Sequence, residues 1–449
     1  MTQDDALKIL KTGANVFLTG EPGAGKTYAI NEFVKYLRER EVEPSITAST
    51  GIAATHICGM TIHSWSGIGI KKFLDKYALD KISGNKAVYQ RVSKAKILII
   101  DEVSMLHADT LYMVDAVCRE IKQKSAPFGG MQVVLVGDFF QLPPITAYSQ
   151  EPAQLGFSKK EKFAYESGAW TKLNPVTCYI TEQYRQDDPE FLSLLSGLRK
   201  NVLEPRHLAH IKARQEFDDA PKNITKLFSH NADVDRVNSD ELKKISGKAE
   251  IFDMTSFGKA NLVESLKKGC LSPEKLELKI GASVMFTKNN SHKGFVNGTT
   301  GTVRGFNKEN NCPIVETSSA KKIWVEPMDW NMEDNGRILA KVTQVPLRLA
   351  WAITVHKSQG MSLDRAVMDL KNVFEYGQGY VALSRVRRLS GLYLLGINDK
   401  ALRVHPEVLA KDADFRQASL EAEKGFSALP LNDISAMHRN FILACNGKQ

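Results

Sequence analysis

The chain of 449 residues is too long for a single hydrophobic core, so we expect two to four domains. Its composition, 43% hydrophobic and 25% charged, is ordinary for a globular protein, and its six cysteines form no CxxC pair, which excludes a zinc ribbon and a disulfide framework and favours a reducing compartment. The net charge of +9, with an isoelectric point near 9.0, favours a polyanionic partner, nucleic acid first.

The N-terminal residues, Met-Thr-Gln-Asp-Asp, carry two acids and no apolar segment. Neither a secretory signal nor a basic transit peptide fits this pattern. No stretch of the chain approaches the ~20 apolar residues that a transmembrane span requires. We therefore expect a cytoplasmic protein with no membrane partner, and we prefer a prokaryotic or viral setting.

Next, the first half of the chain alternates short apolar runs with amphipathic stretches, a rhythm typical of βαβ units and a parallel sheet with helices on both faces. The polar stretch Lys71–Ala95 interrupts the rhythm and predicts a small excursion at about residues 66–95. The candidate strands of this half are Val16–Thr19, Ser45–Ala48, Ile97–Ile100 and Val133–Val136.

A second α/β pattern is split in the sequence, with strands expected at Ile224–Ser229, Arg365–Leu370 and Leu392–Gly396. Between its parts, Lys279–Phe306 alternates apolar and polar residues and contains an Asn-Gly turn signal, which indicates a small inserted β-barrel. The tail from Ala401 is helical in pattern. The predicted boundaries are 1–185 for the first domain, 186–240 with 343–400 for the second, 241–342 for the insertion and 401–449 for a helical extension.

The sequence "GEPGAGKT" matches the phosphate-binding pattern G-x-x-x-x-G-K-[ST] in full, between an apolar strand and a helical stretch. Its backbone N–H groups and the following helix N-terminus would surround the phosphates of ATP. Lys26 would reach the β- and γ-phosphates, and the hydroxyl of Thr27 would bind Mg²⁺. The ATP-binding residues predicted in this loop are Gly20, Pro22, Gly23, Ala24, Gly25, Lys26 and Thr27.

The sequence "ILIIDEVSML" places Asp101 and Glu102 at the end of a hydrophobic strand, where open α/β sheets bind their ligands. Asp101 would hold Mg²⁺ and Glu102 would polarise the attacking water as a general base. Taken alone, an acid in this position could be an ordinary helix N-cap. A GTPase would need Asn-Lys-x-Asp, and the nearest sequence, "NKEN" at residues 307–310, lacks the aspartate.

The motifs "GEPGAGKT", "TASTGIAATHI", "TIHSW", "DEVSML", "GDFFQLPPI", "TEQYRQ", "TVHKSQGMSLD" and "GYVALSRVRR" occur in this order between Gln3 and Pro406. In this order they resemble superfamily-one DNA helicases, and most closely the Pif (petite integration frequency) family, in the branch of the RecD and Dda helicases. The helical stretch "ADTLYMVDAVCREIKQ" resembles that family's signature helix. The resemblance implies two RecA-like domains with ATP between them, single-stranded DNA across their tops, 5′-to-3′ translocation and an SH3-like insertion in the second domain.

The resemblance also implies roles for residues outside the phosphate loop. Gln141 would sense the γ-phosphate, and Asp138 would help to organise the Mg²⁺ side. Arg185 and Arg385 would bring positive charge to the γ-phosphate when the domains close; Arg387 and Arg388 receive no site role. The further ATP-binding residues that it implies are Gln3, which is either an adenine reader or a plain polar residue at a frayed terminus, and Gly360.

For DNA, the resemblance implies a track of backbone donors and flat surfaces along one strand. Pro143 and Pro144 would stiffen their loop, because each proline fixes φ near −65°. Phe139 and Phe140 are open to two interpretations, core packing or base stacking, and Trp65 is assigned to the core. The predicted DNA-binding residues are Ser49, Thr50, His63, Phe140, Pro143, Asn231, His356, Lys357 and Ser358.

The function that the resemblance implies is that of an ATP-dependent 5′-to-3′ DNA helicase, monomeric, acting in DNA replication, repair or recombination. Its partners would be single-stranded DNA and single-strand/duplex junctions; family members are also associated with G-quadruplexes and RNA–DNA hybrids, among which no residue here discriminates. Two alternatives remain open: a RecD-like accessory translocase that unwinds only with partners, and a nucleotide-gated DNA-binding protein.

Overall fold

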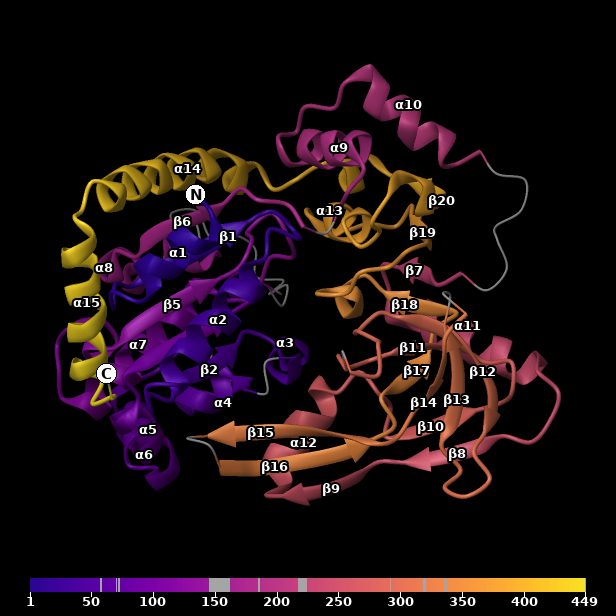
Figure 1. Cartoon of the computed structure of the whole chain (residues 1–449), viewed down its shortest axis with the longest axis horizontal. Helices are drawn as coiled ribbons and strands as arrows, with labels where there is room; N and C mark the ends of the chain where they lie inside the picture. The colour runs from indigo at the N-terminus through magenta and orange to yellow at the C-terminus, as the bar shows by residue number, and fades with distance from the viewer. Residues whose placement is uncertain are drawn as a thin grey trace.

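The structure of the chain, a computed structural model, consists of two α/β lobes and a β-rich part. Figure 1 shows the lobes side by side, with the β-rich part below the second lobe and the two C-terminal helices along the outside of the first. The residues that the structure describes are 1–56, 59–69, 71, 73–144, 162–184, 186–216, 224–290, 292–317, 320–334 and 337–448.

The first lobe is built on a six-stranded, all-parallel sheet in the order β3-β2-β4-β5-β1-β6. Every residue of β1 and β5 is buried, as expected for parallel strands covered on both faces. The four strands predicted in this half are confirmed to within one residue at either end. The strands are β1 (Val16–Gly20), β2 (Ser45–Ala48), β3 (Met60–Thr61), β4 (Ile97–Asp101), β5 (Gln132–Val136) and β6 (Val176–Ile180).

The excursion predicted near residues 66–95 contains two short helices that pack on α7. Arg91 ties it to the lobe, since its Nε donates to the Trp65 carbonyl at 2.9 Å, and Trp65 is buried as expected. In α7, the signature helix, buried Asp115 binds Arg119 at 2.9 Å and the N–H of Phe128 at 2.7 Å, which is a structural role. The helices are α1 (Gln3–Leu10), α2 (Lys26–Arg38), α3 (Gly51–His56), α4 (Ile62–Ser66), α5 (Lys76–Ser83), α6 (Lys86–Lys94), α7 (Ala108–Lys122) and α8 (Gly168–Leu173).

The second lobe contains a parallel sheet in the order β18-β7-β19-β20. Three of its strands lie where the sequence predicts them, and the fourth, β18, is tied to α11 by Asn238, whose side chain bonds both backbone groups of Ala352 at 2.9 Å. The elements are β7 (Lys226–Phe228), β18 (Ala352–Thr354), β19 (Ala366–Leu370), β20 (Leu392–Ile397), α9 (Pro189–Arg199), α10 (Pro205–Ala213), α11 (Asn231–Lys244) and α13 (Gln378–Leu383).

The β-rich part is inserted between α11 and β18, and its described residues form three small antiparallel sheets with one helix. The β15–β16 hairpin extends beneath the first lobe (Figure 1), and α12 packs on α3 so closely that a Cβ at Gly51 would lie 3.3 Å from the Cα of Gly269. Its elements are β8 (Glu250–Asp253), β9 (Thr255–Gly258), α12 (Ala260–Gly269), β10 (Lys275–Leu278), β11 (Ser283–Phe286), β12 (Thr300–Phe306), β13 (Pro313–Thr317), β14 (Lys322–Trp324), β15 (Met328–Asp334), β16 (Arg337–Gln344) and β17 (Leu347–Leu349).

The C-terminal residues form two helices, α14 (Pro406–Ser427) and α15 (Leu431–Ala444), that pack on the first lobe. Helix α14 packs against β6, and the hydroxyl of Ser419 in this helix accepts a hydrogen bond from the N–H of Tyr179 at 3.0 Å. In α15, Ile442 is buried in the apolar cluster around β1. Within the described residues, no helix has both the length and the apolar character needed to cross a membrane.

Candidate functional site

The loop between β1 and α2 has the conformation of a phosphate-binding loop. Gly20 and Gly25 have φ values of 147° and 85°, which other residues rarely adopt. A Cβ at Gly25 would lie 1.8 Å from Nε2 of Gln3, so the glutamine side chain would have to move. Nζ of Lys26 donates to the carbonyls of Gly20 at 2.8 Å and Glu21 at 3.1 Å. The ammonium group therefore lies over the loop at the N-terminus of α2, where phosphate oxygens are favoured.

Strand β4 carries the two predicted carboxylates to the same edge of the sheet. Glu102 is in the left-handed region (φ 52°), where its N–H donates to Oδ1 of Asp101 at 2.8 Å and its carbonyl accepts the Ser49 hydroxyl at 2.7 Å. Burial, and then the charge of Asp101, raise the pKa of Glu102 to about 7, against the opposing charges of Lys26 and Arg385. Burial also raises the pKa of Asp101. A carboxyl that titrates near neutrality suits a general base.

Packing explains the unusual composition of the loop after β5, residues 137–144. Phe139, Phe140 and Leu142 are buried, whereas Gln141, 8% exposed, lines the cleft between the lobes. Gly377, at the N-terminus of α13, packs directly against this loop. A Cβ at Gly377 would lie 2.5 Å from the carbonyl oxygens of both Phe140 and Gln141. The loop is therefore held between the two lobes, with Gln141 directed to the cleft.

The cleft, about 990 Å³ in volume, receives residues from both lobes. Arg385 of the second lobe is 1% exposed, and its guanidinium donates to the Val381 carbonyl and the Ser384 hydroxyl, each at 2.8 Å. Nε2 of Gln359 lies 3.4 Å from a carboxylate oxygen of Glu102 and so joins the lobes. The predicted site residues that line the cleft are Pro22, Gly23, Gly25, Lys26, Thr27, Glu102, Gln141, Gly360 and Arg385.

Several cleft residues are absent from the sequence prediction. Arg387 and Arg388, which received no role, both line the cleft, and Nε of Arg388 donates to Asp187 at 2.8 Å. The aromatic side chains of Tyr184 and Tyr393 line it as well. Tyr184 belongs to the motif "TEQYRQ", and Arg387 and Arg388 belong to "SRVRR". Membership of a motif does not say which of its side chains face a ligand. Arg185 lies outside the described residues.

Gln3 and Ala24 lie beside the cleft rather than in its lining. Nε2 of Gln3 donates to the carbonyl of Ala24 at 3.0 Å, and the N–H of Gln3 donates to Glu182 at 2.7 Å. These bonds hold the glutamine against the phosphate loop, so it is not a frayed polar residue. Its predicted contact with adenine remains a proposal.

The donors at this edge of the sheet fit ATP with Mg²⁺. Mg²⁺ is commonly held by one or two protein oxygens together with phosphate oxygens and water. Asp101 ends β4, Thr27 lies in the first turn of α2, and the positive charge of Lys26 acts on Asp101. Thr27 and Asp101 would therefore hold the ion, which would supply charge neutralisation at the phosphates.

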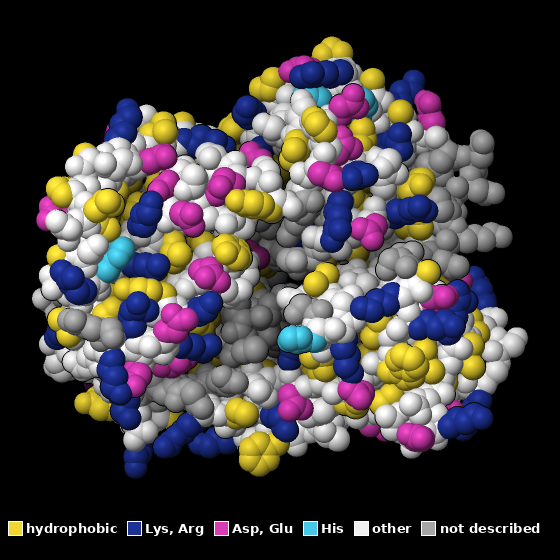
Figure 2. Space-filling view, viewed as in Figure 1, with side chains coloured by type: hydrophobic (Ala, Val, Ile, Leu, Met, Phe, Trp, Pro, Cys, Tyr) yellow, Lys and Arg dark blue, Asp and Glu magenta, His cyan; other side chains and the backbone are white. Residues whose placement is uncertain are grey.

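Five predicted DNA contacts remain compatible with the structure, although some hydroxyls have structural partners. Ser49 is 7% exposed and holds Glu102, while Oγ1 of Thr50 accepts the N–H of Ala53 at 3.2 Å. The three remaining residues are partly exposed, and burial lowers their pKa values. These residues are His63, His356 and Lys357. On the face shown in Figure 2, the surface is hollowed between the lobes, and Lys and Arg side chains lie on both sides of the hollow among acidic ones.

Three further residues that were predicted to contact DNA have side chains that are enclosed in this structure. Phe140 is 2% exposed beneath the guanidinium of Arg199, whose Cζ lies 4.0 Å from the ring centroid. Pro143 is buried, and Ser358 is 0% exposed with its hydroxyl donating to a backbone carbonyl at 2.7 Å. Asn231 begins α11, but its side chain is not among the described groups.

Asp138 also differs from its expected role. Its carboxylate is fully buried and binds Nη1 of Arg199 at 2.8 Å. Because this pairing occupies it, Asp138 does not directly organise the Mg²⁺ side of the cleft. Its negative charge still contributes to the raised pKa of Glu102, after burial and after Asp101.

We expect kcat/KM for ATP hydrolysis to fall as the pH is lowered through about 7. The pKa of Glu102 is raised to about 7, and below that pH the carboxyl is protonated and cannot accept a proton from water. Steady-state kinetics over pH 5.5–9 would measure this limb, with Glu102→Gln expected to be slow throughout. Nucleotide affinity measured over the same pH range separates binding from chemistry. A kcat/KM that does not fall on the acid side of this range would refute the assignment.

Two family models match the chain: PIF1-like helicase over residues 4–199, and DNA helicase Pif1, 2B domain, over residues 261–306. A relative, the ATP-dependent DNA helicase Pif1 of Psychrobacter sp. (strain PRwf-1), is 41% identical over 505 aligned residues that cover 100% of this chain and 75% of the relative. Bacteroides sp. Pif1 in complex with ADP-AlF4 superposes with a TM-score of 0.78 at 29% identity, covering 92% of this chain and 96% of that one. Bacteroides Pif1 bound to ssDNA gives a TM-score of 0.59 at 29% identity, covering 93% and 96%.

Proposed function

Since the chain belongs to the PIF1-like helicase family and is an ATP-dependent DNA helicase, we propose that it moves 5′-to-3′ along single-stranded DNA and separates the strands of duplex DNA ahead of it. One observation carries the motor assignment: residues from both lobes meet in one cleft, with Lys26 and Glu102 on one side and Arg385 on the other. ATP binding alone needs only the phosphate loop. A base and an arginine on opposite lobes suit repeated hydrolysis coupled to lobe movement.

During hydrolysis Lys26 exchanges its carbonyl partners for phosphate oxygens. Glu102, deprotonated near neutral pH, accepts a proton from the attacking water. Gln141 orients that water or the γ-phosphate, and Arg385 stabilises the charge that develops on the transferred phosphoryl group. Thr27 and Asp101 would hold Mg²⁺, which would further neutralise the charge of the phosphates. Because Glu102 is hydrogen-bonded to Gln359 of the second lobe, the position of the base depends on how the lobes are arranged.

Single-stranded DNA is proposed to lie across both lobes along His63, His356 and Lys357. Ser49 joins this track to the cleft, since it directly follows β2 and its hydroxyl donates to the backbone carbonyl of Glu102. DNA binding near Ser49 could therefore shift the general base Glu102. The ssDNA complex of the Bacteroides relative supports single-stranded DNA as the ligand class.

Junctions between single-stranded and duplex DNA are the proposed substrates, in replication, repair or recombination, with the monomer as the working form. G-quadruplexes and RNA–DNA hybrids are further proposed substrates, because unwinding from a single-stranded track acts on whatever structure lies ahead.

Matched partial duplexes with either a 5′ or a 3′ single-stranded tail test the polarity. With ATP and Mg²⁺, we expect strand separation only for the 5′-tailed substrate, measured by release of a fluorescently labelled strand. Lys26→Ala, which removes the ammonium group at the phosphates, is expected to abolish release. Arg304→Ala, at an exposed ion pair with Glu316 in the β-rich part, serves as a matched loss of one positive charge.

Unwinding from the 3′ tail would overturn the proposed direction. If neither substrate opens while single-stranded DNA still stimulates ATP hydrolysis, the chain is a translocase that needs partners. If DNA binding responds to ATP without any turnover, the chain is a nucleotide-gated binding protein.

A further inference from the structure

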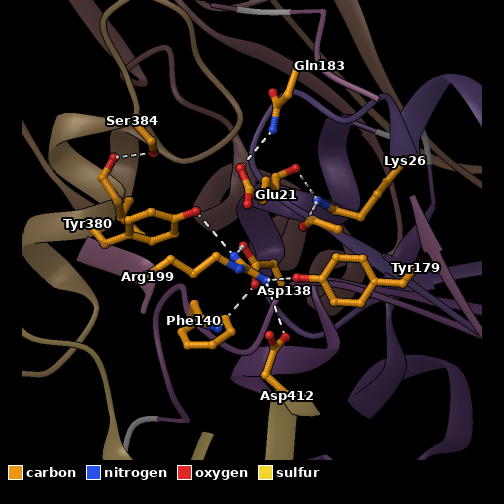
Figure 3. A network of polar contacts seen from close by, with 12 residues as sticks. Glu21, Lys26, Asp138, Phe140, Tyr179, Gln183, Arg199, Tyr380, Ser384 and Asp412 are labelled. Atoms are coloured by element: carbon orange, nitrogen blue, oxygen red, sulfur yellow. Dashed lines mark hydrogen bonds and ion pairs between the residues drawn. The ribbon is translucent and has the colours of Figure 1, made fainter. Parts of the chain in front are cut away.

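A buried polar network lies between the lobes beside the loop that carries Gln141, and Figure 3 shows it from close by. Its centre is the side chain of Arg199, the last residue of α9, which is 2% exposed. None of its charged or phenolic groups faces the ATP cleft. We call this network the Arg199 junction, and its members are Asp138, Tyr179, Arg199, Tyr380 and Asp412.

The guanidinium of Arg199 binds partners from four separate parts of the chain. Nη1 donates to Oδ2 of Asp138 at 2.8 Å and to the hydroxyl of Tyr380 at 3.2 Å. Nη2 donates to the hydroxyl of Tyr179 at 2.8 Å and lies 3.8 Å from Oδ1 of Asp412. These partners belong to the loop after β5, to α13 of the second lobe, to β6 of the first lobe and to α14.

Through Asp138, the junction holds the loop that presents Gln141. Oδ1 of Asp138 accepts the N–H of Phe140 at 3.2 Å, and its carbonyl accepts the N–H of Gln141 at 2.9 Å. The other carboxylate oxygen, Oδ2, binds Arg199. One buried carboxylate thus fixes a tight turn at one end and Arg199 at the other, so displacement of Arg199 would displace Gln141.

Through Tyr380, the junction holds the helix that precedes Arg385. Helix α13 is only six residues long, and Nε of Arg385 donates back to the Val381 carbonyl at 2.8 Å. At the other end of the helix, Gly377 packs on the carbonyl of Gln141. A helix this short moves as one piece. The positions of Gln141 and Arg385 are therefore linked through α13 and the Tyr380 hydroxyl.

The C-terminal helix completes the junction from the outer side. Asp412 of α14 binds Nε of Arg416 at 2.6 Å, and Nη2 of Arg416 donates to the Tyr179 hydroxyl, also at 2.6 Å. Tyr179 is therefore held between two guanidinium groups, from Arg199 and Arg416. The sequence gives no role to this extension, yet two of its side chains complete the shell around Arg199.

We propose that Arg199 is a positioning residue for ATP hydrolysis, which sets Gln141 and Arg385 relative to each other across the lobe boundary, and that α14 is part of this device through Asp412 and Arg416. The inference rests on the proposed function, because it presumes ATP turnover in the cleft.

The chemistry of the guanidinium explains why such a junction would define one arrangement of the lobes. Its planar fork satisfies Asp138, Tyr179 and Tyr380 together in only one geometry. Nε of Arg199 is buried without a hydrogen-bond partner, so the guanidinium relies on the bonds of Nη1 and Nη2. An arrangement that broke these bonds would leave still more of a buried charge without partners, which is costly. We therefore expect the two lobes to adopt a few discrete relative positions at Arg199, and not a continuous range of positions.

Tyr380→Phe is the sharpest variant, since it removes one hydroxyl and keeps the ring. We expect kcat for DNA-stimulated ATP hydrolysis to fall about 10-fold, the size expected for one hydrogen bond to a charged group, with KM for ATP nearly unchanged. Tyr376→Phe is the matched control, since Tyr376 precedes the same helix outside the junction. Loss of this buried hydrogen bond should also lower the melting temperature of Tyr380→Phe modestly, whereas Tyr376→Phe should melt close to the wild type. The values of kcat are therefore compared below both melting temperatures.

Asp412→Asn tests the contribution of α14, with Asp414→Asn as its control, because Asp414 pairs only with Lys411 at the surface. We expect Asp412→Asn to lower kcat and Asp414→Asn to leave it unchanged. The double variant Tyr380→Phe/Asp412→Asn should lower kcat by less than the product of the single effects, because both changes act on Arg199.

The outcomes separate the inference from the proposed function. A wild-type chain without DNA-stimulated ATP hydrolysis would refute the proposed function itself. An active wild type with Tyr380→Phe at full kcat would overturn the inference alone. So would a variant that loses melting temperature but keeps kcat below its melting point, because that result describes a purely structural contact.

Discussion

Replacing Arg385 with alanine is expected to lower kcat for DNA-stimulated ATP hydrolysis by about 10³-fold or more, the effect seen when an arginine finger is removed from a phosphoryl-transfer site. The guanidinium enters the cleft from the second lobe and its charge already acts on Glu102. Its contribution is largest when charge develops on the transferred group, so ATP binding should weaken much less than turnover. Single-turnover hydrolysis with saturating DNA measures the chemical step directly.

The matched control is Arg206→Ala, which removes an exposed arginine paired with Glu204 at the start of α10. Because Arg385 also bonds backbone carbonyls at Val381, Ser358 and Met361, thermal melting must accompany the kinetics. Arg385→Lys keeps the charge but not the planar fork, and should recover only part of the rate. A folded Arg385→Ala variant with wild-type turnover would exclude Arg385 as the finger and leave Arg387 or Arg388, which also line the cleft.

The sheet and the nucleotide loop could be predicted from the sequence because both are local. A buried parallel strand is a continuous apolar run, and the phosphate loop needs its glycines at fixed spacing. The same locality explains why Lys26 and Glu102 fall where the motifs place them. Glu102 directly follows β4 and Lys26 ends the loop after β1, and the carboxyl ends of these strands share one edge of the sheet.

Side-chain direction and distant partners could not be predicted in the same way. Phe140, Pro143 and Ser358 belong to motifs that contact ligands, but motif membership does not say which neighbour faces the ligand and which faces the core. Arg199 ends the unremarkable run "LSGLR", and its partner Tyr380 lies 181 residues away. Only the fold brings these two residues together, so no local pattern could signal the junction.

Replacing Arg199 with alanine is expected to lower the free energy of unfolding by about 3–5 kcal/mol, the usual result of removing one partner from a buried ion pair. Asp138 is fully buried and would be left without the guanidinium that now pairs with it. Tyr179 and Tyr380 would each lose a hydrogen bond as well. Urea unfolding, followed by circular dichroism and by tryptophan fluorescence, would measure the difference and check that both probes report one transition.

Asp138→Asn in the Arg199→Ala background distinguishes an unpaired charge from a simple loss of packing. If the charge is the cause, the double variant should be more stable than Arg199→Ala, because an amide is less costly to bury than a carboxylate. Loss of packing over Phe140 would instead persist in the double variant, since that ring stays uncovered. Arg304→Ala, at an exposed pair, should change the unfolding free energy little.

The stability result also bears on the proposed coupling. A hydrogen bond transmits the position of one group to another only if breaking it is costly, and in water the Arg199 bonds would be exchanged for solvent at little cost. If Arg199→Ala were no more destabilising than Arg304→Ala, water would have to reach the junction in solution. Gln141 and Arg385 would then be positioned independently, and the Tyr380 hydroxyl would have no route by which to affect turnover. A large loss of stability with Arg199→Ala is therefore a necessary condition for the positioning role.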